Sequence, residues 1–64
     1  MSVRYVVQIE KKDGSVAYRG GVGASRVRRP EHAERFASLE VAMLAMQTTP
    51  STEGERLSVA TVYL

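Results

Sequence analysis

The fold of this chain is decided by residues 3–18, which read VRYVVQIEKKDGSVAY. The first eight of these residues alternate between apolar and polar side chains, with Val6 as the one exception. The apolar members of the alternation are Val3, Tyr5, Val7 and Ile9. A period of two is typical of a strand with one buried face. We therefore expect a strand here, and because it is the most apolar strand we expect it at the centre of a sheet.

The dipeptide Asp13-Gly14 follows this strand. Asp-Gly is among the strongest signals for a two-residue hairpin loop of type I′, in which both loop residues have positive φ. That loop would place Ile9 opposite Tyr18. Because cross-strand partners share a face, Val16 and Tyr18 would join the apolar face of the first strand. The sequence predicts a hairpin with both tyrosines of this stretch on the inner face.

A helix is expected between Pro30 and Thr48, and its start is open. Pro30 suits the first turn of a long helix. Alternatively, Ser38 caps a shorter helix, and residues 30–35 form a separate turn. We favour the shorter helix. Its expected core stripe consists of Phe36, Leu39, Met43 and Met46.

Residues 57–64, LSVATVYL, predict a third strand, because they are uncharged and rich in β-branched side chains. Residues 20–25 and 48–55 hold the glycines, prolines and small polar residues of loops. The expected fold is of the α+β class: a single ββαβ domain over residues 1–64. Its three-stranded antiparallel sheet has the order 2-1-3, with one helix packed on one face.

Composition excludes several classes of protein. The chain has 64 residues, no Cys and one His, so disulfide scaffolds and Cys-ligated metal centres are impossible. His32 is the only histidine and lies among charged residues, and the spacing of the serines around it does not indicate a catalytic Ser–His–acid arrangement. We therefore expect that the protein is not an enzyme and that it binds no metal and no cofactor. The glycines of residues 20–23 lack the Lys-Ser or Lys-Thr of a phosphate-binding loop. The chain has no apolar run long enough to span a membrane and no signal-peptide layout, so we expect a cytoplasmic protein.

Positive charge is concentrated in the first part of the chain. Residues 1–29 hold seven bases and two acids, and residues 30–64 hold two bases and five acids. The predicted partner-binding residues are four arginines close together in sequence, Arg19, Arg26, Arg28 and Arg29. Such a segment binds an acidic protein surface, follows a nucleic-acid backbone, or is only solvated. The net charge of +2 is low for a dedicated nucleic-acid binder, so an acidic protein is the preferred partner.

The last strand is expected at an edge of the sheet. Residues 58–64 contain no charge, Pro or Gly, the features that usually protect an edge strand. We therefore expect pairing with a second copy or with a partner strand, although Arg56 and the preceding loop could instead shield the edge. The expected contact residues are Val59, Thr61, Val62 and Tyr63.

Two resemblances add to this interpretation. Residues 5–14 and 16–18, with Ser38-Leu39-Glu40-Val41-Ala42 later, resemble the opening of HicB-type antitoxins. That resemblance implies binding of a small toxin and an antitoxin-like homodimer. The Pro-Gly-Cys segment and the additional domain of that family are missing here, so DNA repression is not implied.

Residues 33–42, AERFASLEVA, are similar to a pattern of small accessory proteins of phages and mobile elements. This similarity implies a compact, non-enzymatic protein that binds a host macromolecule, a class that includes anti-CRISPR proteins. The function expected from the sequence is thus a phage-type inhibitor of a host protein or defence complex, acting in the host cytoplasm. The alternatives are a small nucleic-acid-binding protein that uses residues 19–29, and an antitoxin-like homodimer.

Overall fold

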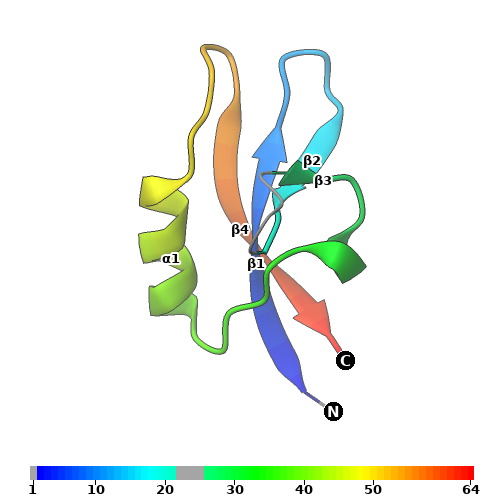
Figure 1. Cartoon of the computed structure of the whole chain (residues 1–64), viewed down its shortest axis with the longest axis vertical. Coiled ribbons are helices and arrows are strands. Elements are labelled where there is room, and N and C mark those ends of the chain that lie inside the picture. Colours follow the sequence, from blue (N-terminus) through cyan, green and yellow to red (C-terminus); the bar gives the residue numbers. More distant parts are fainter. Residues whose placement is uncertain (1, 22–25) are drawn as a thin grey trace.

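The computed structural model describes residues 2–21 and 26–64 as a four-stranded antiparallel sheet with one α-helix (Figure 1). The strands are β1 (Val3–Glu10), β2 (Val16–Arg19), β3 (Arg26–Val27) and β4 (Arg56–Tyr63), in the order β3-β2-β1-β4. The α+β class, the single helix and the neighbours of β1 are confirmed. The prediction of three strands is wrong, because the two residues of β3 extend the sheet beside β2.

The central position of β1 is confirmed. β4 pairs with β1 along its whole length, from Val3 opposite Tyr63 to Glu10 opposite Arg56. On its other edge, β1 pairs with β2 near its C-terminal end and with Phe36 near its N-terminal end. The backbones of Tyr5 and Phe36 exchange two hydrogen bonds of 2.8 and 2.9 Å. β1 therefore has hydrogen-bonded neighbours on both of its edges.

The predicted hairpin register is wrong by one residue. Ile9 lies opposite Ala17, and Tyr18 lies opposite Gln8. The loop has three residues, because Lys11 and Ser15 pair through the backbone and the Gly14 N–H donates to the Lys11 carbonyl. Only Gly14 has positive φ there, at 91°, while Asp13 accepts hydrogen bonds from the Ser15 N–H and hydroxyl. These bonds lower the pKa of the Asp13 carboxyl and stabilise a turn in which Asp13 keeps negative φ.

Because partners across a sheet share a face, this register turns Tyr18 away from Ile9. The helix face of the sheet carries Val7, Ile9, Ala17 and Val59. The second face carries Val6, Gln8, Tyr18, Val27, Ala60 and Val62. The tyrosine expected inside is thus on the face that α1 does not cover.

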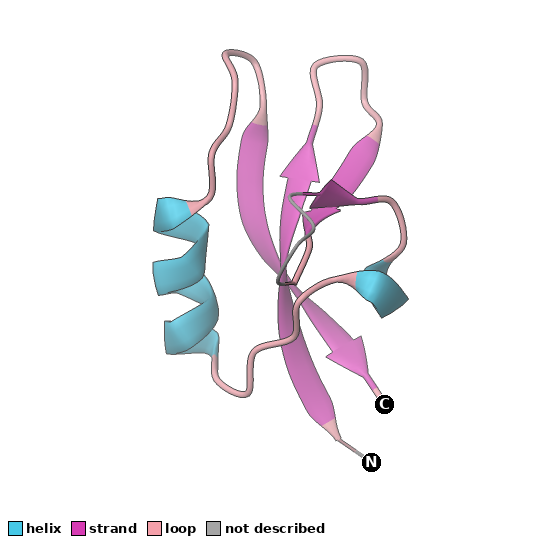
Figure 2. Ribbon diagram, viewed as in Figure 1, coloured by secondary structure: helices cyan, strands magenta, loops and turns pink. Residues whose placement is uncertain are grey.

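The helix α1 (Leu39–Thr48) begins after Ser38, whose hydroxyl accepts a hydrogen bond from the Val41 N–H. Residues 30–32 form the separate 3₁₀ turn η1 (Pro30–His32). The shorter of the two expected helices is therefore confirmed. In the view of Figure 2, α1 and η1 lie on opposite sides of the strands.

The core is small and lies mainly on β1. Val6, Val7 and Ile9 have no exposed surface, and the other buried apolar residues are alanines: Ala17, Ala33 and Ala42. α1 packs on β1 and β4 through Ala42, whereas Leu39 is 48% exposed and Met43 is 46% exposed. Their predicted core positions are wrong, because the short side chain of Ala42 lets the helix approach the sheet along a different stripe. No helix in the described residues is long and apolar enough to cross a membrane.

The turn at Gly14 generates a stability prediction. Gly14→Ala should lower the free energy of unfolding by about 1 kcal/mol or more, because an L side chain is strained at positive φ. Gly21→Ala is the matched control, since Gly21 has ordinary φ and open space around its Cα. Urea unfolding measures both variants, and equal losses would contradict the assigned turn.

Candidate functional site

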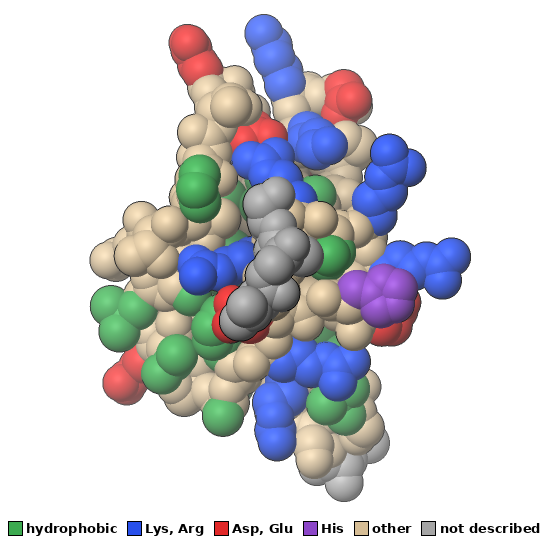
Figure 3. Space-filling view, in the orientation of Figure 1, with side chains coloured by type: hydrophobic (Ala, Val, Ile, Leu, Met, Phe, Trp, Pro, Cys, Tyr) green, Lys and Arg blue, Asp and Glu red, His purple; other side chains and the backbone are tan. Residues whose placement is uncertain are grey.

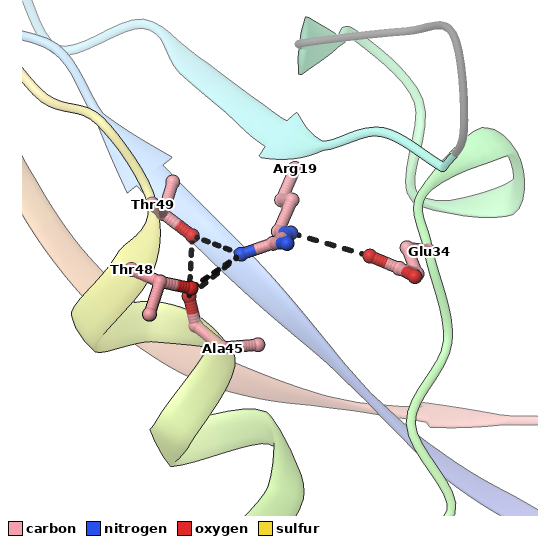
Figure 4. Close-up of polar contacts among 5 residues, drawn as sticks. All are labelled: Arg19, Glu34, Ala45, Thr48 and Thr49. Carbon is pink, nitrogen blue, oxygen red and sulfur yellow. Dashed lines mark hydrogen bonds and ion pairs between the residues drawn. The ribbon is translucent and has the colours of Figure 1, made fainter.

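Arg19, the last residue of β2, is held by the end of α1 (Figure 4). Its Nη1 donates to the Ala45 carbonyl at 2.7 Å and to the hydroxyls of Thr49 and Thr48 at 3.0 and 3.2 Å. On the other side, its Nε forms an ion pair of 3.2 Å with Glu34. One guanidinium thus joins β2, α1 and the segment between η1 and α1.

Arg19 supplies hydrogen bonds and positive charge at the C-terminal end of α1. The last carbonyls of a helix have no partner within the helix and carry partial negative charge. The last turn of α1 has no basic residue of its own. Arg19 supplies this charge from the sheet, and the hydroxyls of Thr48 and Thr49 also donate to the Ala45 carbonyl, at 3.0 and 2.7 Å.

Arg26 holds the loop that precedes β4. Its two terminal nitrogens lie 2.7 and 2.8 Å from the two carboxylate oxygens of Glu55, and one of them also donates to the Pro50 carbonyl. Glu55 accepts a further hydrogen bond from the Thr52 N–H at 2.8 Å. The Arg26 side chain, followed by the Thr52 N–H, lowers the pKa of Glu55 to about 2. The carboxylate therefore stays charged through the ordinary pH range.

The structure divides the four predicted arginines into two pairs. Arg19 and Arg26 are half-buried and have internal partners, as above. Arg28 and Arg29 are exposed, directly after β3, and form no ion pair within the described residues. Figure 3 shows Lys and Arg side chains spread over the upper and right-hand margins of the molecule. Only the second pair is available to a partner without breaking internal contacts.

The second face of the sheet carries the paired side chains of Tyr18 and Val27 at its β3 side. Tyr18 lies opposite both Gln8 and Val27, and Arg28 follows Val27 in the chain. Tyr18 and Val27 are each half-buried. Sequence reasoning missed this surface, because it depends on the one-residue change in register. The three-residue loop is stabilised by the hydrogen bonds that Asp13 accepts from Ser15. The sequence signal for this loop was therefore the presence of Ser15 two residues after Asp13.

Three of the four predicted edge residues lie on one face of β4 and the fourth lies on the other face. Val59 and Tyr63 lie on the helix face, opposite Val7 and Val3, and Thr61 shares that face. Val62 lies on the second face, opposite Arg4. The edge position of β4 is confirmed by the strand order. Val59, Thr61 and Tyr63 therefore share one face of β4, and Val62 lies apart from them on the other.

Other candidate chemistry is sparse in the described residues. His32 is exposed at the end of η1. No three His, Asp or Glu side chains of residues 2–21 and 26–64 lie close enough together to hold a metal ion. A shallow polar hollow of about 360 Å³ lies between the β1–β2 turn and the loop before β4. Its lining residues are Glu10, Lys11, Lys12, Gly14, Gly54 and Arg56. The glycine-rich loop expected over residues 20–25 falls mainly outside the described residues.

In comparisons with known proteins, no family model matches this chain, and no curated protein or solved structure matches it significantly.

Arg19 should be a structural residue. Arg19→Ala should lower the free energy of unfolding by about 2 kcal/mol, because it leaves the Ala45 carbonyl and the buried Thr49 hydroxyl with fewer partners. Arg29→Ala should change it by no more than about 0.5 kcal/mol, because that side chain is exposed. Denaturant unfolding of the two variants decides the assignment, and equal effects would contradict it.

The pair of Arg26 and Glu55 should make stability depend on acid pH. The pKa of Glu55 falls from 4.5 to about 2 on folding, so its contribution is complete above pH 4.5 and is lost as pH falls toward 2. The Glu55→Gln variant should be less stable than the wild type at neutral pH and should lose less stability between pH 4.5 and pH 2. Glu53→Gln is the control, because it removes an exposed carboxylate from the same loop. Urea unfolding at a series of pH values measures how the free energy of unfolding depends on pH. If the Glu55→Gln variant showed the same pH dependence as the wild type and the Glu53→Gln control, Glu55 would not be the titrating group.

Proposed function

We propose that this chain is a non-enzymatic domain that binds an acidic surface of another protein, in the manner of a phage-type inhibitor of a host protein or defence complex. The observation that carries the proposal is the placement of Arg28 and Arg29. Both are exposed and follow Val27 directly in the chain, and Val27 pairs with the half-buried Tyr18 on the second face of the sheet.

Electrostatics supports a protein partner that is acidic. Arg19 and Arg26 are largely neutralised by Glu34 and Glu55. The charge that remains for a partner at this end of the sheet comes from Arg28 and Arg29. Guanidinium groups bind carboxylates through paired hydrogen bonds, so Asp and Glu side chains are the natural complement.

The neighbouring side chains support an interface rather than a purely solvated segment. Protein interfaces are enriched in Tyr and Arg around a less polar centre. Tyr18 and Val27 supply such a centre, and the two arginines supply one side of its rim. A standard interface takes about 800 Å² from each partner. The chain exposes 4594 Å², so this one contact would use about one sixth of its surface.

A nucleic acid is the second candidate, and the observed register favours it more than the sequence did. Tyr18 lies on the second face opposite Val27, and Arg28 and Arg29 follow Val27 directly in the chain. Aromatic rings that stack on bases, with arginines on phosphates, are typical of single-strand binding. Tyr5 does not add to this surface, because it lies on the helix face opposite Thr61.

The experiment compares two double variants that remove the same charge. Immobilised protein is exposed to a nuclease-treated bacterial lysate and, separately, to labelled single-stranded DNA and RNA over a range of salt concentrations. Arg28→Ala/Arg29→Ala should lose a protein captured by the wild type, whereas Lys11→Ala/Lys12→Ala at the far hairpin should retain it.

Two results would refute this assignment. Capture of the same protein by both double variants would remove the arginines from the interface. Binding of nucleic acid with a steep negative dependence on salt, lost in the arginine variant alone, would establish the second candidate instead.

A further inference from the structure

The outer edge of β4 carries a regular row of unused main-chain groups. Ser2 and Leu64 exchange two backbone hydrogen bonds across β1 and β4. Because hydrogen-bonded pairs alternate along an antiparallel ladder, the even-numbered residues of β4 direct their N–H and C=O groups toward β1. The outward groups belong to Leu57, Val59, Thr61 and Tyr63, and no hydrogen bond to them is found within the described residues.

We propose that a second copy of this chain pairs with this edge, β4 against β4 in antiparallel orientation, about a two-fold axis at Ala60. This inference goes beyond the proposed function and uses a different surface. In this register, Leu57 pairs with Tyr63 of the second copy, and Val59 pairs with Thr61. Each of the four outward residues then exchanges two backbone hydrogen bonds with a residue of the second copy. If the register between the two β4 strands were shifted by two residues in either direction, one outward residue of each copy would have no partner.

The same geometry determines where the helices lie. In β4, only the odd-numbered residues direct their main-chain groups outward, and their side chains all lie on the helix face. Each hydrogen-bonded pair between the two copies therefore joins two residues of the helix face. The two copies of α1 must therefore lie on the same face of the combined sheet. Each α1 packs over both β1 and β4, and strands are spaced about 4.8 Å apart. The two helix axes would be about 10 Å apart, which is the ordinary distance for packed helices.

The exposed side of α1 suits that contact. Leu39 and Met43 are four positions apart on one side of α1 and are 48% and 46% exposed, and the neighbouring Leu44 is 62% exposed. Val41 is also exposed, but it lies on nearly the opposite side of the helix from Met43 and is outside this contact. Figure 3 shows hydrophobic side chains gathered on the left, where Figure 1 places α1 beside β4. A second copy would cover this apolar surface and the hydrogen-bonding edge together.

Two further observations favour a second copy over an unrelated strand. The only charged residue of β4 is Arg56, which the two-fold axis places opposite Leu64, so like charges do not meet. Among residues 2–21 and 26–64, only three large side chains are also fully buried: Val6, Val7 and Ile9. A domain of this size with so small a core gains stability by association. Tyr63, 68% exposed, would pack on Leu57 of the second copy.

Single cysteines test the axis directly, because the natural chain has none. Ala60→Cys should form an intermolecular disulfide on mild oxidation, since the two Cα atoms would lie about 4.5 Å apart. Ser58→Cys is the matched control on the same face of the same strand. Its two Cα atoms would lie about 13 Å apart, too far for a disulfide. Cross-linking of the control at the same rate would overturn the register.

Sedimentation of the unmodified chain tests the dimer independently of any variant. The wild type should have twice the mass of 7.0 kDa, and Thr61→Pro should weaken association by roughly tenfold or more. The Thr61 N–H points outward, so this Pro removes no bond to β1, and Thr61→Val should remain dimeric. A wild-type mass of 7.0 kDa at all concentrations would overturn the proposal. Capture by Arg28 and Arg29 is unaffected by that result, so the two proposals fail separately.

Discussion

The rest of the structure depends on the burial of β1 from both sides and its hydrogen bonding along both edges. Val6 is fully buried on the second face, and Val7 and Ile9 are fully buried on the helix face. β4 covers one edge over eight residues, while β2 and Phe36 share the other. A strand of this kind requires every surrounding segment to be in place, because its polar main chain is removed from water.

The arginines show how a small domain uses charge for structure. With so few large residues in the core, the ends of its elements are held by polar contacts instead: Arg19 at the end of α1 and Arg26 on the loop before β4. Both guanidiniums connect segments more than 20 residues apart in the chain. The arginine-rich segment is therefore divided: Arg19 and Arg26 have internal partners, and Arg28 and Arg29 are exposed. Net charge alone could not have separated these roles.

The two proposed surfaces are compatible with each other. The one around Tyr18, Val27, Arg28 and Arg29 lies at the β3 side of the sheet, and the β4 edge lies at the opposite side. A dimer through β4 would therefore present two copies of the arginine surface. Two linked sites bind a repeated or symmetric partner more strongly than one site does.

Local patterns in the sequence determined much of this fold. The alternation in β1, the Ser38 cap, the uncharged last strand and its place at the edge were all predictable, because each depends on neighbouring residues or on a simple period. The four candidate arginines were also identified from the sequence, although not their division into two pairs.

Only the tertiary structure decided the hairpin register, the stripe of α1 that faces the sheet, and the partners of Arg19 and Arg26. Asp13-Gly14 is compatible with two loop lengths, and the hydrogen bonds to Ser15 select between them. The helix has apolar residues around most of its circumference, so its pattern did not identify Ala42 as the contact. An ion pair between residues far apart in the chain leaves no periodic signal, because it depends on where the whole fold brings the two side chains.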